Sequence, residues 1–172
     1  MDTPTPDWLA ELRAGDFLLT SPHEPSLYSR LIRLFTGSQW THVAMFAGGE
    51  TLVEALKDGI VYMPVHRYAQ GYDIAVCRVS GATPKHRARA VAIMRAWAAT
   101  ETRYGYLDVV RLGLRRVGWP FHGHSIRQTL FCSEAVVLAY QVAGIEISRL
   151  PADEVAPADL GQHIVSIHTH SR

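Results

Sequence analysis

The stretch that decides the fold runs over residues 40–56 and reads WTHVAMFAGGETLVEAL. Residues 41–47 are rich in apolar and β-branched side chains, two glycines follow, and residues 51–56 return with the same character. Two such runs joined by a short glycine turn are typical of a β-hairpin. A histidine, His42, and a carboxylate, Glu54, interrupt the apolar runs. Either group needs a hydrogen-bonding partner if it is buried.

The length of the loop decides whether these two groups meet. A two-residue loop over the glycines turns His42 and Glu54 to opposite faces of the hairpin. A three-residue loop that also includes Ala47 pairs Phe46 with Glu50 and puts His42 directly opposite Glu54. Their Cβ atoms are then about 5 Å apart, close enough for a hydrogen bond. Because burying both groups makes sense only if they meet, we expect the three-residue loop.

Outward from the hairpin, capping signals delimit the helices. Ser26 is placed to cap a helix that Gly37 ends. Thr83 and Pro84 begin another that extends to about residue 99. In the first of these helices the apolar positions at helical spacing are Leu27, Leu31, Leu34 and Phe35. Further helices are expected over residues 8–13, 106–117 and 132–144, and strands over 17–20, 60–65, 73–79 and 164–167.

The composition fits one folded domain, and the closely spaced strands favour an α+β fold in which an antiparallel sheet or a small barrel packs against helices. The chain has 172 residues, of which 48 % are hydrophobic and 19 % charged, which excludes a disordered chain. A net charge of +1 excludes a dedicated nucleic-acid binder, which is usually far more basic. Two cysteines are too few for a disulfide framework. We therefore expect a single domain over residues 1–172.

The N-terminal residues and the hydropathy predict where the protein acts. Residues 1–7 lack the basic region and apolar core of a secretory signal. No window approaches the ~18 consecutive apolar residues that a membrane-spanning helix needs. We expect a cytoplasmic protein without a transmembrane anchor, and leave export by another route open.

Cys132 stands at the expected start of a mostly apolar helix, in the stretch LFCSEA over residues 130–135. The N-terminus of a helix carries partial positive charge and unpaired N–H groups. That field stabilises a thiolate, and the same N–H groups can hold a developing oxyanion. The alternative is a small buried hydrophobe, which is what we expect of Cys77. Taken alone, His42 is likewise more typical of a satisfied core histidine.

Together, Cys132, His42 and Glu54 indicate nucleophilic catalysis. In such a set the cysteine attacks a carbonyl, the histidine takes the thiol proton and later donates it to the leaving group, and the carboxylate orients the imidazole. Distance along the chain is no obstacle, because these groups need only meet in space.

Five short motifs carry a resemblance to a known family. They are GDFLL at residues 15–19, WTHVAM at 40–45, VEA at 53–55 followed by DGIV at 58–61, FCSEAV at 131–136 and APADL at 156–160. In this order the chain resembles, over about residues 13–165, the circularly permuted papain-fold cysteine hydrolases, the YiiX/YaeF-like branch of the NlpC-type superfamily. In that family a histidine on a strand precedes the cysteine on a helix, the reverse of the order in papain.

The resemblance implies a thiol hydrolase of the amidase or peptidase class that needs no cofactor, with Cys132 as nucleophile, His42 as base and Glu54 as the third polar residue. We expect a peptide or amide-containing substrate, and leave a peptidoglycan fragment and an acyl lipid open as its source. The alternatives are a lipid-directed acyltransferase or thioesterase and a non-catalytic binding module. Phe131 argues against the acyltransferase, because lecithin-retinol-acyltransferase-like relatives typically place asparagine before the cysteine. The presence of all three residues, Cys132, His42 and Glu54, argues against a non-catalytic binding module.

Aromatic and histidine side chains elsewhere are candidates for the substrate pocket. They are Tyr28, Trp40, Tyr104, Tyr106, Trp119 and His124. His122 and His124 have a spacing that can ligate a metal, but no convergent Asp, Glu or Cys accompanies them in the sequence. We therefore expect this segment to line the active-site cleft rather than to bind a metal.

Overall fold

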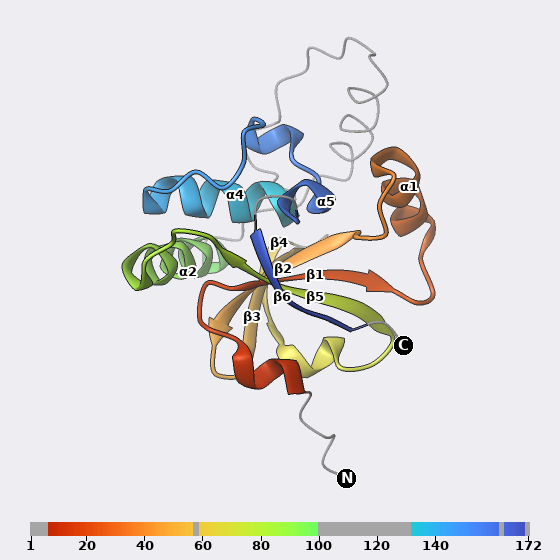
Figure 1. Cartoon of the computed structure of the whole chain (residues 1–172), viewed down its shortest axis with the longest axis horizontal. Helices are drawn as coiled ribbons and strands as arrows, with labels where there is room; N and C mark the ends of the chain where they lie inside the picture. Colours follow the sequence, from red (N-terminus) through yellow and green to blue (C-terminus); the bar gives the residue numbers. More distant parts are fainter. Residues whose placement is uncertain (1–6, 57–58, 100–131, 162–163, 171–172) are drawn as a thin grey trace.

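A computed structural model describes residues 7–56, 59–99, 132–161 and 164–170 (Figure 1). Its elements, with η for a 3₁₀-helix, are η1 Asp7–Glu11, β1 Phe17–Pro22, α1 Leu27–Thr36, β2 His42–Gly48, β3 Thr51–Leu56, β4 Gly59–Pro64, η2 Val65–Tyr68, β5 Tyr72–Val79, α2 Pro84–Ala99, α4 Cys132–Ala143, η3 Ala152–Glu154, α5 Pro157–Leu160 and β6 Ile164–His170. The helix expected over residues 106–117 lies outside the described residues.

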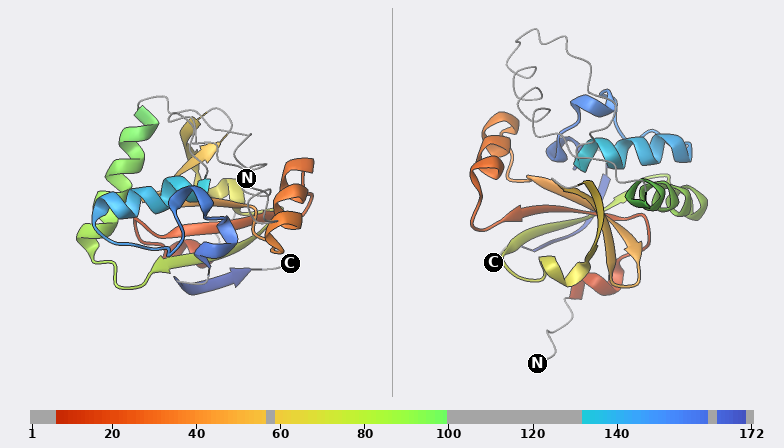
Figure 2. Two further views of the ribbon diagram at one scale, coloured as in Figure 1. Left: turned by 90° about the horizontal axis from the view of Figure 1, so that it is seen from above. Right: turned by 180° about the vertical axis from the view of Figure 1, so that it is seen from behind.

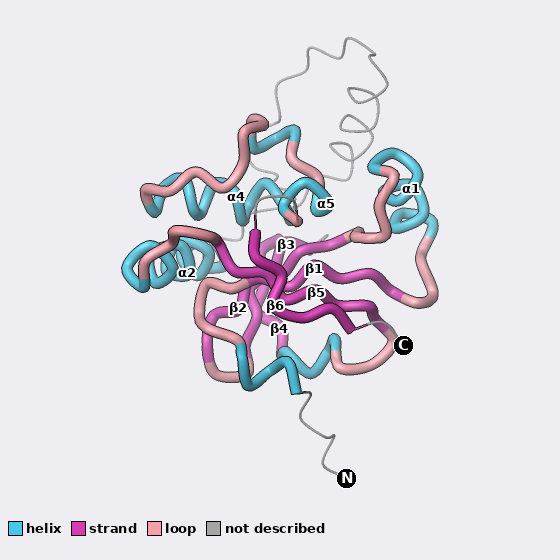
Figure 3. Tube along the Cα trace, viewed as in Figure 1, coloured by secondary structure: helices cyan, strands magenta, loops and turns pink. Residues whose placement is uncertain are grey.

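The described strands form one six-stranded sheet in the order β4-β3-β2-β1-β5-β6, and every neighbouring pair is antiparallel (Figure 3). The strands β2, β3 and β4 form a meander, in which each strand pairs with the next one along the chain. The strand β1 lies between β2 and β5. The α+β class with an antiparallel sheet packed against helices is therefore confirmed.

Alternating apolar side chains give the sheet two buried faces. On one face Phe17, Val43 and Met45 belong to a core cluster that includes buried residues of α2 and α4. On the other face Leu18 and Ala44 belong to a cluster that includes residues of η1 and η2. Figure 2 shows α2 and α4 side by side on one side of the sheet, with the 3₁₀-helices η1 and η2 on the other. The sheet is therefore covered on both faces.

The hairpin of β2 and β3 forms, but its expected register is wrong. Glu54 lies opposite Ala44 and not opposite His42, and Gly48 pairs with Thr51, so that the loop has two residues rather than three. The cause is an irregularity between Phe46 and Gly48 that gives β2 one residue more than its partner strand. Because side chains alternate with a period of two, the two-residue shift leaves His42 and Glu54 on the same face, now as diagonal neighbours.

The expected caps are present. The Ser26 side chain accepts a hydrogen bond from the backbone N–H of Ser29, and Gly37 ends α1 in the left-handed conformation with φ of 63°. Gly144, with φ of 98°, follows the last residue of α4. Glycine adopts such positive φ angles at no steric cost, which favours the end of both helices at these positions.

The apolar stripe expected along α1 is not buried as a whole. Leu27 and Leu34 are each 75 % exposed, and Ile32 is the residue of this helix that is buried. Figure 1 shows α1 on the side of the molecule away from α2, and these two leucines, two turns apart, join neither core cluster of the described residues. Helical spacing predicted the helix correctly but not the face that packs.

Candidate active site

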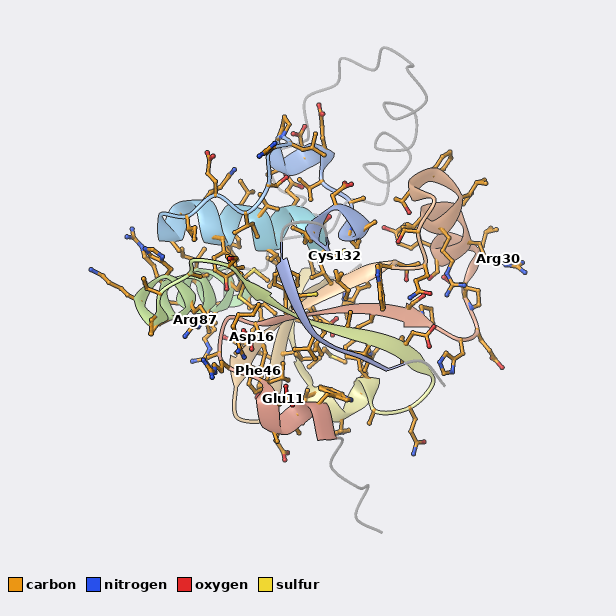
Figure 4. The ribbon with its side chains drawn as sticks, viewed as in Figure 1. Glu11, Asp16, Arg30, Phe46, Arg87 and Cys132 are labelled. Atoms are coloured by element: carbon orange, nitrogen blue, oxygen red, sulfur yellow. The ribbon has the colours of Figure 1, made fainter. Side chains whose placement is uncertain are left out.

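Two chain segments far apart in sequence bring Cys132 and His42 together. Cys132 is the first residue of α4, and His42 is the first residue of β2. The helix packs across β2 and β3, and Figure 4 shows Cys132 at its start, on the side that faces the sheet. Cys132 is 4 % exposed, and it belongs to the core cluster on the α2 and α4 face.

The imidazole of His42 is tied to Glu54. Its Nε2 lies 2.5 Å from Oε2 of Glu54, whose side chain is fully buried, while the His42 side chain is 18 % exposed. An ionised carboxylate has no hydrogen to give, so Nε2–H is the donor. Burial alone would raise the pKa of Glu54, but the hydrogen bond and charge of His42, together with a hydrogen bond from Tyr68, lower it. Glu54 is therefore a buried carboxylate that stays ionised.

The same imidazole interacts with Cys132. Burial alone would lower the pKa of His42, but the charge of Cys132 and a side-chain hydrogen bond with it, followed by those of Glu54, raise the pKa to about 10. Since Glu54 occupies Nε2, Nδ1 is the ring nitrogen left for the cysteine. The imidazole of His42 thus interacts with Cys132 as well as with Glu54.

The three groups join the two faces of the sheet. Glu54 alternates with residues of the α2 and α4 face, so it lies with Leu52 on the opposite face, where Tyr68 also lies. Cys132 belongs to the α2 and α4 face. Because His42 stands at the end of its strand, its ring can touch Glu54 on one side and Cys132 on the other.

The segment from Val155 to Asp159 lies next to the start of α4 and is bonded to it. The hydroxyl of Ser133, next to the cysteine, donates to the backbone oxygen of Val155 at 2.5 Å. One residue on, the backbone N–H of Ala156 donates to Oδ2 of Asp159 at 2.7 Å, which closes the first turn of α5. These bonds fix the position of the helix end that carries Cys132.

One residue of the site was missed by the sequence reasoning. Tyr68, the last residue of η2, is 3 % exposed and donates its hydroxyl to Oε2 of Glu54 at 2.5 Å. Its ring also stacks on His42, with ring centroids 6.4 Å apart and an angle of 30° between the planes. No periodic pattern marks a four-residue 3₁₀-helix. The one available signal was that a buried Glu54 needs donors besides His42.

The residues predicted for the substrate pocket are only partly placed. Tyr28 is half-buried in α1, and Trp40 is half-buried against the core cluster that includes Cys132. The remaining four (Tyr104, Tyr106, Trp119 and His124), as well as His122, lie outside the described residues. Their role in binding stays a prediction.

Cys77, expected to be a packing residue, lies in the middle of β5 and is 2 % exposed. Burial, helped by the charge of Asp16, raises the pKa of Cys77 to about 12. At neutral pH it is therefore a thiol packed in the core.

A surface hollow of about 300 Å³ lies elsewhere, lined by Val79, Ser80, Glu146, Ile147, Ser148 and Arg149. It contains none of Cys132, His42 and Glu54 and is not part of this site.

Within the described part of the chain, no group of three or more His, Cys, Asp or Glu side chains is arranged to hold a metal ion. None of the described helices combines the length and the apolar character needed to span a bilayer.

Comparison with known proteins places this geometry in a family context. The family model for permuted papain-like amidase enzymes, the YaeF/YiiX or C92 family, matches residues 11–154. The probable lipoprotein peptidase YaeF of Escherichia coli strain K12 is 24 % identical over 87 % of this chain, which spans 63 % of the length of that relative. The crystal structure of the metalloprotein yiiX from Escherichia coli O157:H7 superposes with a TM-score of 0.66 at 16 % identity, over 93 % of this chain and 97 % of the other. The expected family resemblance is confirmed.

Proposed function

The chain belongs to the family of permuted papain-like amidases, and on that premise we propose that it is a cysteine amidase that cleaves an amide or peptide bond. Cys132 is its nucleophile, His42 its base and Glu54 the residue that orients the imidazole. The observation that carries the proposal is that one imidazole, His42, interacts with both the Cys132 sulfur and the Glu54 carboxylate.

The first half of the reaction forms an acyl-enzyme. His42, whose pKa is raised to about 10, already holds on Nδ1 the proton taken from Cys132, and the sulfur attacks the carbonyl carbon of the scissile amide. A C–S bond forms and the carbonyl oxygen takes up the negative charge. His42 then gives its proton to the amide nitrogen, the C–N bond breaks, and the amine leaves. Throughout, the Glu54 carboxylate stabilises the imidazolium from Nε2.

The second half regenerates the enzyme. His42 takes a proton from a water molecule, whose oxygen attacks the thioester carbon. The C–S bond breaks, the acid product leaves, and His42 keeps the proton beside the sulfur, which restores the resting state. Since Cys132 is the first residue of α4, the unpaired backbone N–H groups of the first turn are placed to stabilise the oxyanion in both halves.

The substrate class follows from the family and from one relative. The family is described as amidases, and the relative YaeF as a probable lipoprotein peptidase. Both favour an amide or peptide bond over an ester. Peptides from peptidoglycan fragments are therefore the first substrates to assay, with acyl esters as the comparison.

The proposal is tested with Cys132→Ala, using Cys77→Ala as the matched control because both cysteines are buried. Both variants should fold as the parent does, by circular dichroism and thermal melting. Cys132→Ala should lose at least about a thousandfold in peptide cleavage, detected by mass spectrometry of the products, while Cys77→Ala retains activity. Full activity of Cys132→Ala would contradict the proposal.

A further inference from the structure

The hydrogen bonds of the Glu54 carboxylate are unevenly shared between its two oxygens. Oε2 accepts both from Nε2 of His42 and from the hydroxyl of Tyr68, each at 2.5 Å. Oε1 is buried and has no hydrogen-bond partner among the described residues. Because both donors bond to the same oxygen, the hydroxyl of Tyr68 helps to hold Oε2, rather than Oε1, against the imidazole.

Tyr68 is built to remain a donor to Glu54. It is 3 % exposed, and burial together with the adjacent Glu54 carboxylate raises its pKa above the ordinary value of a phenol. The phenol therefore keeps its proton at neutral pH. A buried carboxylate that loses such a donor bears the full cost of its desolvation.

The ring of Tyr68 makes a second, independent contact with the site. It stacks on His42 at a centroid distance of 6.4 Å. The ring of Tyr72 packs edge-on against the ring of Tyr68, at a centroid distance of 4.9 Å. Tyr68 thus touches both the carboxylate and the imidazole while lying on the face of the sheet opposite the core cluster of Cys132.

We propose that Tyr68 is a positioning residue for the reaction: its hydroxyl holds the Glu54 carboxylate in the orientation that binds Nε2 of His42, and its ring supports the imidazole from the side. The inference rests on the proposed function of Cys132, His42 and Glu54. Tyr68 acts through Glu54 and His42 and has no contact with substrate in this role.

Three groups act on the charge of Glu54, and a test of Tyr68 must leave the other two unchanged. His42 and Tyr68 bond to it directly, and the charge of the exposed Arg67 also lowers the pKa of Glu54. The hydroxyl of Tyr68 is removed without changing any charge by Tyr68→Phe, which keeps the ring and its stacking. Tyr72→Phe removes a neighbouring phenol hydroxyl that does not bond to Glu54 and is the matched control.

In Tyr68→Phe, kcat should fall roughly tenfold with KM unchanged, because a hydrogen bond to a charged group is lost. Since that hydrogen bond lowers the pKa of Glu54, its removal raises the pKa, and the acid limb of the pH–rate profile should move up by about one pH unit. Tyr72→Phe should leave kcat and both limbs where they are. Tyr68→Leu, which also removes the ring, should lose more activity than Tyr68→Phe.

The proposal is overturned if Tyr68→Phe has the parent's kcat and pH profile, or if it loses activity with an unmoved acid limb, since a purely structural role would do the latter. It is also overturned if Tyr72→Phe behaves in the same way as Tyr68→Phe. Each of these results leaves the dependence of activity on Cys132 intact, so they are distinguishable from failure of the proposed function, in which Cys132→Ala remains active.

Discussion

Two buried acid–base pairs lie on the same face of the sheet, near opposite ends of β1, and they are built differently. Next to the start of β1, Asp16 accepts from Arg78 through both oxygens, at 2.8 and 2.6 Å, and its Oδ2 also accepts from the backbone N–H of Arg13. Near the other end, where Thr20 pairs with His42, Glu54 leaves one oxygen without a partner among the described residues. Figure 4 shows Asp16 beside Phe46 and Glu11, away from Cys132.

The difference separates a pair that holds the fold from a pair that can move a proton. A guanidinium does not lose its proton at any relevant pH, and its two-pronged contact saturates Asp16. An imidazole can give its proton away, and it has a second nitrogen for another group. Of these two pairs, the His42 pair also interacts with the proposed nucleophile, Cys132. We therefore expect substitutions in the two pairs to change different measurable quantities.

Removing the imidazole should have the largest effect on activity. His42→Ala should lower kcat/KM by about a thousandfold, because the site loses its proton carrier. The control is His23→Ala, which removes the exposed histidine that pairs with Asp73 at 3.2 Å and should leave kcat/KM unchanged. If His42→Ala kept activity while folded, the contrast between the two pairs would fail.

Removing the carboxylate of the other pair should instead change stability. Asp16→Ala removes the buried carboxylate that binds the partly exposed Arg78, which should lower the free energy of unfolding by about 1–3 kcal/mol in urea denaturation. Asp73→Ala breaks a partly exposed pair and should cost less than about 1 kcal/mol. The folded fraction of Asp16→Ala should cleave substrate at the parent's rate. A selective loss of kcat in Asp16→Ala would show that this pair serves the chemistry as well.

The most gradual of the expected effects is the pH dependence of stability. The folded-state pKa of His42, about 10, lies above its ordinary value of 6.5. Its stabilising contribution is therefore complete below pH 6.5 and is lost as the pH rises toward 10, by at most about 1.4 kcal/mol per pH unit for one proton. Urea denaturation between pH 6.5 and 9 should show this decline, and Glu54→Gln should reduce it. An equal slope in both proteins would mean that Glu54 does not hold the imidazolium.

Much of the fold was predictable because its signals are local. The glycine turn fixed the hairpin, Ser26 and Gly37 fixed the ends of α1, and the apolar run after Cys132 fixed α4. The requirement that a buried histidine and a buried carboxylate find partners was enough to put His42 and Glu54 on one face. The exact register was not predictable, because the irregularity at Ala47 depends on how β2 meets its neighbours.

What the sequence did not reveal is held together by distant contacts. Tyr68 reaches Glu54 across 14 positions from a short 3₁₀-helix, and Arg78 reaches Asp16 across 62. Neither pair has a spacing that any secondary-structure period predicts. The exposure of Leu27 and Leu34 was missed for the same reason, since helical periodicity does not say which face meets a neighbour.

The most direct measurement of the central claim compares the two buried cysteines under alkylation. The parent protein is treated with iodoacetamide at pH 6, and the modification of each cysteine is followed by peptide mass spectrometry. Cys132, at the start of α4 beside His42, should be alkylated much faster than Cys77, whose pKa is raised to about 12, and His42→Ala should abolish the advantage. Equal rates for Cys132 and Cys77 in the folded protein would contradict the account.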